Sequence, residues 1–241
     1  MSRSNNQTEK QSGPAIDEQA ISSQNGIENA SEPLMLALPK GRLMESTLGL
    51  FAKAGISVPT QDAGRKLIIE SEDNSLNYIM ARTSDVATYV EYGAADIGVC
   101  GLNALRESDR NVFEPLLLPI GQCRLSLCGF PDSLNTPLRY ATYPRVATSY
   151  PKQTAEFFQR QGINAEVIYL KGSVELSPLV GLADMIVDIV ETGSTLNANG
   201  LVEIQTVMHS QAVLIVNRAA NRLKAASIQK LLNSLESVIS S

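Results

Sequence analysis

Histidine is nearly absent from this chain of 241 residues, which contains only His209. A metal site built from several histidines is therefore excluded, and a Ser-His-Asp triad would need His209 itself as its base. The three cysteines, Cys100, Cys123 and Cys128, cannot all pair, and their spacing matches neither a CxxC redox motif nor a zinc knuckle. These absences predict a protein of a reducing cytoplasm, with no metal held by its own side chains.

Long apolar runs and a surplus of positive charge are also missing. No run approaches the roughly 18 apolar residues that span a bilayer, and the N-terminus lacks the apolar core of a signal peptide. The net charge is −5, of which residues 1–32, with two basic and five acidic side chains, carry −3. Neither part of the chain has the basic surface of a nucleic-acid-binding protein. The sequence thus predicts neither a membrane nor a nucleic-acid partner, and an anionic substrate must be attracted by local cations.

The chain divides by composition into a polar tail and a folded part. Residues 1–32 are rich in Ser, Asn, Gln and Glu and have few large apolar groups, which predicts a disordered tail. From Leu34 onward, short apolar runs alternate with amphipathic stretches, which is typical of β-α-β units and a mostly parallel sheet. We expect two α/β lobes with a ligand-binding cleft between them, domain I comprising 33–119 and 206–241, and domain II comprising 120–205.

The apolar pattern also predicts individual elements. Strands are expected at Leu34–Leu38, Leu67–Glu70, Leu76–Arg82, Asp96–Cys100, Arg124–Gly129, Val146–Thr148, Glu166–Leu170, Met185–Val190 and Ala212–Asn217. Helices are expected after Gly41, around Val86–Val90, after Pro151, and at the C-terminus, where Ile228, Leu231, Leu232, Leu235 and Ile239 form one stripe.

A tight turn after a buried strand carries the strongest chemical signal. Asp188-Ile-Val-Glu191 leads into Thr192-Gly193-Ser194-Thr195. Gly193 lets the backbone approach a ligand, while N–H groups, hydroxyls and a following helix N-terminus can donate to phosphate oxygens. The alternative is an ordinary strand-to-helix turn with a Ser/Thr cap.

A second signal is a pair of cations at the end of the first strand. Lys40-Gly41-Arg42 puts a mobile point charge, a flexible glycine and a bidentate guanidinium at a helix start, which suits a polyphosphate. Arg65, Lys66 and Arg82 add cations near the ends of neighbouring strands. The alternative for each is a solvated surface charge.

These residues belong to a longer pattern that resembles the signature of ATP phosphoribosyltransferases, the enzymes that open histidine biosynthesis. The matching segments are Ala37–Arg42, Arg82-x2-Asp85-Val86, Tyr89–Gly98, Ala147–Pro151, Gly172–Glu175, and Glu175-x5-Gly181-x-Ala183-x2-Ile186-x-Asp188-Ile189-x2-Thr192-Gly193-x-Thr195-Leu196. Asn103 departs from the family pattern, which often has an acidic residue there.

The resemblance implies a two-lobed fold like that of type II periplasmic binding proteins. It also implies a reaction in which N1 of the adenine of ATP attacks C1 of phosphoribosyl pyrophosphate, with Mg²⁺ bound to the pyrophosphate. The chain is similar to the short form of the family, a catalytic subunit that associates with a histidyl-tRNA-synthetase-like regulatory protein. We therefore expect a homodimer within a hetero-oligomer. A non-catalytic solute-binding domain of the same fold, and a phosphoribosyltransferase acting on another base, are the alternatives.

The predicted site residues fall into three groups. Catalytic charge neutralisation is assigned to Lys40, Arg42 and Arg65. Phosphoribosyl binding is assigned to Glu175, Asp184 (in reserve), Asp188, Glu191, Thr192, Gly193, Ser194 and Thr195. Nucleotide binding is assigned to Lys40, Gly41, Arg42, Arg82, Asp96 and Gly101.

Overall fold

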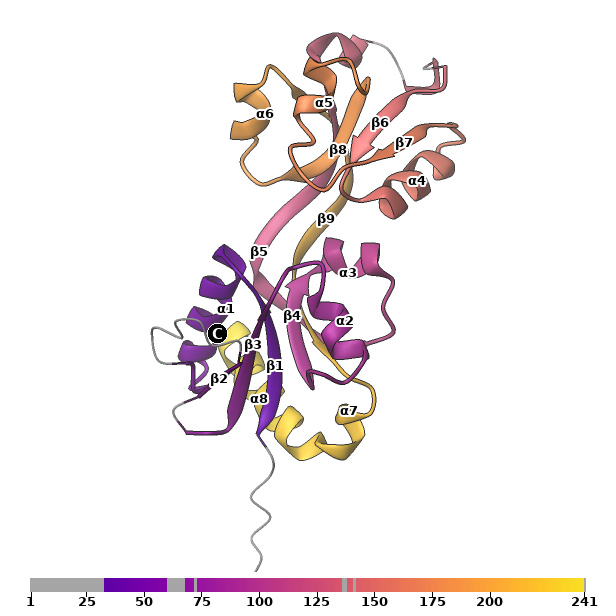
Figure 1. The fold of residues 1–241 in the computed structure, drawn as a ribbon. Helices are drawn as coiled ribbons and strands as arrows, with labels where there is room; N and C mark the ends of the chain where they lie inside the picture. Colours follow the sequence, from indigo (N-terminus) through magenta and orange to yellow (C-terminus); the bar gives the residue numbers. More distant parts are fainter. Residues whose placement is uncertain (1–32, 60–67, 72, 136–137, 141, 241) are drawn as a thin grey trace, which may run out of the picture. The chain divides into compact units, whose positions relative to one another are not determined.

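A computed structural model describes residues 33–59, 68–71, 73–135, 138–140 and 142–240 (Figure 1). Nine strands form one sheet in the order β2-β3-β1-β4-β9-β5-β8-β6-β7. The strands are β1 (Leu34–Pro39), β2 (Ile68–Glu70), β3 (Leu76–Ala81), β4 (Ile97–Gly101), β5 (Phe113–Gly129), β6 (Arg145–Thr148), β7 (Glu166–Tyr169), β8 (Met185–Val190) and β9 (Val202–Val216). The α-helices are α1 (Arg42–Lys53), α2 (Val86–Glu91), α3 (Leu102–Ser108), α4 (Pro151–Arg160), α5 (Leu176–Leu179), α6 (Ser194–Ala198), α7 (Ala220–Leu223) and α8 (Ala225–Ile239). Two short 3-10 helices lie at Pro131–Asn135 and Leu138–Tyr140.

The sheet contains two parallel groups joined by antiparallel strands. In the first group β3, β1 and β4 run parallel, and in the second β8, β6 and β7 run parallel. β5 and β9 pair with each other and with β8 and β4, always antiparallel, and β2 pairs antiparallel with β3. The prediction of an α/β sheet is confirmed, but the prediction of a mostly parallel one is wrong. The strands between the two groups, β5 and β9, run antiparallel to their neighbours.

The long connecting strands were only half predicted. β5 begins at Phe113 and β9 at Val202, well before the segments expected from the apolar pattern. Pro115, Pro119 and Gly121 interrupt the first half of β5, and its pairing with β9 shifts register between Leu118 and Cys123. A strand that is partly exposed and interrupted by a bulge lacks the continuous apolar run by which a buried strand is recognised.

Core packing separates two lobes along these strands. We call the elements β1–β4, α1–α3, α7 and α8 the first lobe, and β6–β8 and α4–α6 the second. In the first lobe, α1 and α8 pack on one face of the sheet and α2 and α3 on the other. The predicted stripe of α8 is packed there: Ile228, Leu231, Leu232 and Leu235 are buried.

The second lobe has its own core. Phe157 and Phe158 of α4 pack with Val187 on one face of the sheet, and Leu196 of α6 packs with Ile186 on the other. The two lobes thus have separate cores, while the domain boundaries at 119–120 and 205–206 stay a prediction. The predicted tail, residues 1–32, and the cations Arg65 and Lys66 lie outside the described residues.

Parallel pairing fixes where the connecting loops emerge. Because parallel strands end at the same edge, the residues after β1, β3 and β4 gather at one edge of the first lobe. The residues after β6, β7 and β8 gather at one edge of the second lobe in the same way. We call these the two carboxyl edges. Among the described helices, none is long and apolar enough to cross a membrane.

We expect Gly98→Ala to destabilise the first lobe. A Cβ at Gly98 in β4 would lie 2.7 Å from Cγ2 of Val90 and 2.8 Å from Cγ1 of Val86, both buried on α2. Overpacking of this kind costs about 1–3 kcal/mol of unfolding free energy. The matched control is Gly49→Ala, because a Cβ at this helical position meets nothing within 4 Å, and the change should stabilise by about 0.5–1 kcal/mol. Urea titration of both variants measures the difference, and a Gly98→Ala protein as stable as the control would refute this packing.

Candidate functional site

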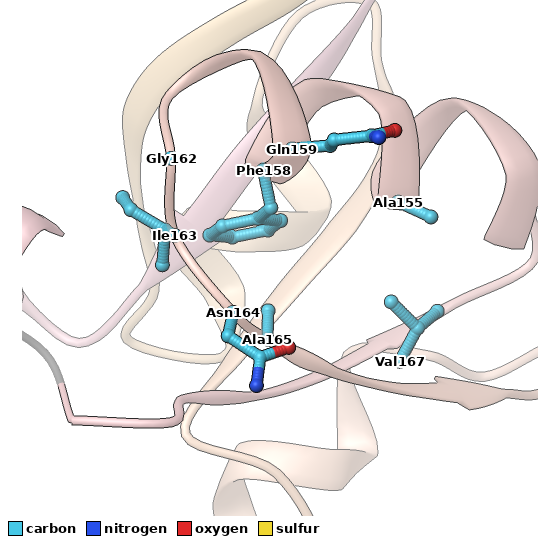
Figure 2. Close-up of a pocket in the computed structure, with 8 residues that line it drawn as sticks. All are labelled: Ala155, Phe158, Gln159, Gly162, Ile163, Asn164, Ala165 and Val167. Atoms are coloured by element: carbon cyan, nitrogen blue, oxygen red, sulfur yellow. The ribbon is translucent and has the colours of Figure 1, made fainter.

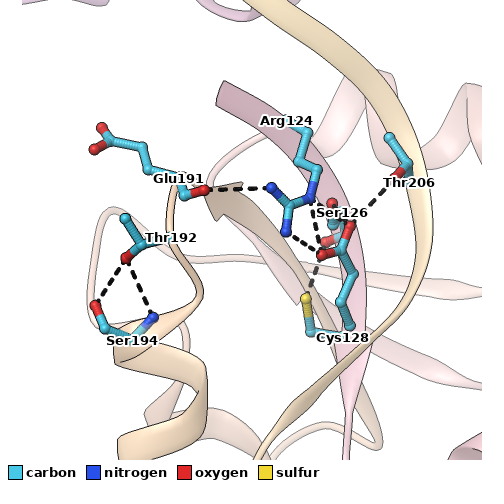
Figure 3. A network of polar contacts seen from close by, with 8 residues as sticks. Arg124, Ser126, Cys128, Glu191, Thr192, Ser194 and Thr206 are labelled. Carbon is cyan, nitrogen blue, oxygen red and sulfur yellow. Dashed lines mark hydrogen bonds and ion pairs between the residues drawn. The ribbon is translucent and has the colours of Figure 1, made fainter. Parts of the chain in front are cut away.

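The turn between β8 and α6 has the backbone that a phosphate loop requires. Gly193 has φ +82°, a left-handed conformation that glycine adopts without strain. Around it, the Thr192 and Ser194 hydroxyl oxygens lie 3.1 Å apart (Figure 3). The N–H of Asn197 donates to the Gly193 carbonyl at 3.0 Å. The first N–H groups of α6 have no partner within the helix, so they and these hydroxyls can donate to a ligand.

A pocket of about 370 Å³ opens on this turn. Its lining consists of Arg42, Asp188, Ile189, Val190, Glu191, Thr192, Gly193, Ser194, Thr195 and Leu196. The structure thus brings the predicted loop, from Asp188 through Thr195, into one cavity. It also brings Arg42, which is 149 positions away from Glu191 in sequence, to the same place.

Arg42 and Glu191 form an ion pair between the two carboxyl edges. The Arg42 guanidinium donates two hydrogen bonds to the Glu191 carboxylate, at 2.8 and 3.2 Å. The two side chains are 83% and 46% exposed. An exposed pair of this kind contributes at most about 1 kcal/mol, so an anionic ligand can replace Glu191 at the guanidinium with little loss.

Four other predicted residues lie with Arg42 at the first carboxyl edge. The N–H of Lys40 donates to the Ala81 carbonyl at 3.2 Å, which places Lys40 beside Arg82 at the end of β3. Gly101 ends β4, the strand that pairs with the other side of β1. Gly41 has φ +89°, and α1 begins directly after it. Lys40, Gly41 and Arg82 are exposed, so an anion can reach them.

Two predicted carboxylates, Asp188 and Glu175, lie at the second carboxyl edge. Asp188 lies near the end of β8, and Glu175 precedes α5, after β7. Burial raises the pKa of Asp188 above its ordinary value, the N–H of Ile189 opposes this at 2.8 Å, and the nearby charge of Glu175 raises it further. A half-buried carboxylate beside a second one suits an acceptor for ligand hydroxyls.

Two predicted acidic residues lie at the amino ends of their strands. Asp184 precedes β8 and accepts hydrogen bonds from the N–H and guanidinium of Arg145, at 2.8 and 3.0 Å. Asp96 precedes β4 and accepts from the N–H of Met35 and from Nζ of Lys224, both at 2.8 Å. Each carboxylate lies at the amino end of its strand, and its oxygens accept hydrogen bonds from other residues of the chain. The ribose role of Asp184, in reserve, and the nucleotide role of Asp96 stay predictions, although both carboxylates bond to other residues of the chain.

Comparisons with known proteins agree with the geometry. Residues 82–237 match the family model for ATP phosphoribosyltransferase. The ATP phosphoribosyltransferase of Caldanaerobacter subterraneus subsp. tengcongensis is 47% identical over 85% of this chain and 96% of its own length. A solved complex from Thermotoga maritima, described as ATP phosphoribosyl transferase (HisG:HisZ), matches with a TM-score of 0.74 at 34% identity, over 86% of this chain and 97% of that one.

The chain belongs to the ATP phosphoribosyltransferase family. The periplasmic aliphatic sulphonate binding protein of Escherichia coli shares the fold, with a TM-score of 0.58 at 12% identity over 88% of this chain and 74% of that one. The predicted two-lobed, periplasmic-binding-protein-like fold is thus confirmed. The family membership favours an enzyme over a non-catalytic solute-binding domain.

In this transferase a buried polar network joins α3 to α4, and sequence reasoning missed it. Asn103 donates from Nδ2 to the hydroxyl of Tyr150 at 3.1 Å and accepts from the Ser210 hydroxyl at 2.8 Å. Burial raises the pKa of the Tyr150 hydroxyl, and the charge of Asp188 raises it further. An ionised acidic residue at position 103 could not donate to Tyr150. The departure noted at Asn103 marks this position in the sequence but not its partners.

A second pocket of the transferase lies in the second lobe. It has a volume of about 390 Å³ and is lined by residues of α4, β7 and the segment between them (Figure 2). The Phe158 ring and Val167 line it together with the amide side chains of Gln159 and Asn164. No charged side chain lines this pocket, so it does not suit a phosphate ligand.

The raised pKa of Asp188 predicts how the free energy of unfolding depends on pH. As the pH rises, the unfolded chain releases this proton first, so an ionised Asp188 lowers the free energy of unfolding above its raised pKa. Below the ordinary value of 3.8 both states are protonated and the penalty disappears. Asp188→Asn keeps an oxygen for the Ile189 N–H, and it should raise the melting temperature at pH 7.5, with a gain that shrinks as the pH falls toward 3.8.

Asp184→Asn is the matched control for this prediction. The hydrogen bonds of Arg145 lower the pKa of Asp184, so its charge stabilises the fold above pH 3.8 and this contribution is lost as the pH falls further. The control should therefore lower the melting temperature at pH 7.5. Thermal melts of both variants across pH measure the two signs, and equal signs would contradict the assigned environments.

Proposed function

We propose that this chain transfers the 5-phosphoribosyl group of phosphoribosyl pyrophosphate to N1 of the adenine of ATP. The products are N1-(5-phosphoribosyl)-ATP and pyrophosphate, in the first step of histidine biosynthesis. One observation carries the proposal: a phosphate-loop turn on one carboxyl edge shares a pocket with Arg42 from the other edge.

The phosphoribosyl group is assigned to the second lobe. Its 5-phosphate binds at the turn Thr192–Thr195, where Gly193 allows close approach and the N–H groups and hydroxyls donate. Asp188 and Glu175 accept from the two ribose hydroxyls, which orients C1 of the ribose toward the first lobe. A hydroxyl donor removes the repulsion that Asp188 and Glu175 otherwise exert on each other.

The ATP and the leaving pyrophosphate are assigned to the first carboxyl edge. Lys40 and Arg42 neutralise the pyrophosphate, Arg65 remains a further candidate, and Gly41, Arg82 and Gly101 contact the nucleotide. We propose that Mg²⁺ enters bound to the oxygens of the pyrophosphate. A Mg²⁺ ion commonly keeps several waters and binds through substrate phosphates.

The chemistry asks little of a general base. The lone pair on N1 attacks C1 while the bond from C1 to the pyrophosphate oxygen breaks, so the protein must align two polyanions and stabilise the departing charge. The residues at the two edges are suited to that task. Arg42 can leave the Glu191 carboxylate and donate the same two hydrogen bonds to a phosphate.

A product assay tests the function directly. The protein is incubated with ATP, phosphoribosyl pyrophosphate and Mg²⁺, and the reaction is analysed by mass spectrometry. Formation of phosphoribosyl-ATP and pyrophosphate is expected. A ribosylated product with another base but not with ATP would assign a different phosphoribosyltransferase activity, and binding without product would assign a solute-binding role.

Replacing Gly193 tests the phosphate turn. Gly193→Val should abolish measurable binding of phosphoribosyl pyrophosphate by calorimetry, because a β-branched side chain obstructs the backbone donors and disfavours φ +82°. Gly200→Val is the matched control, since Gly200 also has positive φ (+69°) and nothing within 4 Å of its Cβ, but lies beyond α6. Unchanged affinity in Gly193→Val, or equal loss in both variants, would remove the assignment.

We further propose that the chain acts in the cytoplasm, as a homodimer within a hetero-oligomer that contains a histidyl-tRNA-synthetase-like regulatory subunit. The Thermotoga maritima relative, solved as a HisG:HisZ complex, supports this proposal. The isolated chain should catalyse the reaction without responding to histidine, and inhibition should appear when the regulatory subunit is added. Potent inhibition of the isolated chain in a steady-state histidine titration would contradict the proposed division of labour.

A further inference from the structure

Arg124 lies where β8 leaves the sheet and the phosphate turn begins. In the β5–β8 pairing, Arg124 is opposite Val190, the last residue of β8. The next residue is Glu191, and beyond it the turn is outside the sheet. The Arg124 guanidinium donates from Nη1 to the Glu191 carbonyl at 3.3 Å, so the side chain holds the first residue past the last pair (Figure 3).

Glu203 of β9 fixes the guanidinium in this position. Nε of Arg124 lies 2.8 Å from both Glu203 carboxylate oxygens, and Nη2 lies 2.6 Å from one of them. The Ser126 hydroxyl donates to the same carboxylate at 2.7 Å and the Thr206 hydroxyl at 3.2 Å. These contacts, led by the hydrogen bonds from Arg124, lower the pKa of Glu203 to about 2. The pair therefore keeps its charges and geometry throughout the neutral range.

We propose that Arg124 and Glu203 are a positioning pair that holds the turn Glu191–Thr195 in the conformation that binds the 5-phosphate. This inference rests on the proposed function, because it assumes that the phosphoribosyl group occupies this turn. Position argues against direct ligation: Arg124 does not line the pocket of the turn. The charge of Arg124 also argues against direct ligation, since the bonded Glu203 carboxylate neutralises the guanidinium locally.

The planar fork of arginine is essential to this arrangement. Nε and Nη2 face Glu203 while Nη1 faces the Glu191 carbonyl, so one rigid group bridges β9 and the turn. A lysine would keep the positive charge but present a single nitrogen, which cannot hold both acceptors in the same geometry. Glu203→Gln keeps the shape of the side chain but removes the charge that fixes the guanidinium. The substituted residue lies in β9, outside the turn.

The experiment compares Arg124→Lys, Glu203→Gln and the double variant in steady-state assays with each substrate varied in turn. The matched control is Glu114→Gln, which disrupts another two-pronged Arg–Glu pair. In that pair Arg106 of α3 lies 2.7 and 2.7 Å from Glu114 at the start of β5. We expect each single variant to raise KM for phosphoribosyl pyrophosphate by about 10-fold, with KM for ATP and kcat within about twofold of wild type. The double variant should be no worse than the more affected single one, because both act through one contact.

Each other outcome identifies a specific failure. A raised KM in Arg124→Lys with a wild-type KM in Glu203→Gln would make Arg124 a direct phosphate ligand and overturn the pair. Equal loss for both substrates, accompanied by a lower melting temperature like that of the Glu114→Gln control, would reduce the pair to a structural role. If Gly193→Val binds phosphoribosyl pyrophosphate normally, the turn assignment itself fails. If Gly193→Val loses binding while Glu203→Gln has wild-type kinetics, only the positioning inference fails.

Discussion

Parallel strands end at a common edge of their sheet, and the candidate site depends on this constraint more than on any single contact. β1, β3 and β4 deliver Lys40, Arg82 and Gly101 to one edge. β6, β7 and β8 deliver Tyr150, Glu175 and the turn at Gly193 to another. The antiparallel strands β5 and β9 join the two groups in one sheet, and the ion pair of Arg42 with Glu191 connects the edges.

Charges within the site are compensated locally. The chain as a whole has a net charge of −5, so no general positive field attracts an anionic substrate. Instead, Arg42 is paired with Glu191 and Arg124 with Glu203. The first pair is exposed and can exchange its anion, whereas the second is more buried and held by further hydroxyls, so it can maintain a shape. We infer that the difference in burial separates a substrate contact from a scaffold.

The local sequence predicted the parts of this site that are continuous along the chain. Buried strands followed by glycine turns located β1, β8 and the pocket-lining segment Asp188–Thr195, because an apolar run and a positive-φ glycine are both local features. Asp96 and Asp184 stand at the amino ends of strands that the sequence predicted. Their partners, Lys224 and Arg145, come from distant segments and could not be predicted from the local pattern.

Pairings between distant segments could not be predicted in this way. Arg124 and Glu203 are 79 residues apart, and they meet only because two antiparallel strands bring them together across a bulged register. The same holds for Asn103 with Tyr150, which contact between α3 and the start of α4. Nothing in the periodicity of either segment indicates such a partner.

A structure of the protein with phosphoribosyl pyrophosphate and Mg²⁺ bound tests the central claim most directly. The account predicts that the 5-phosphate oxygens lie within about 3 Å of backbone N–H groups of the turn Thr192–Thr195, the usual length of such hydrogen bonds. It also predicts that the Arg42 guanidinium has exchanged the Glu191 carboxylate for the pyrophosphate. A 5-phosphate bound instead beside Lys40 and Arg82, with the turn at Gly193 free of ligand, would contradict it.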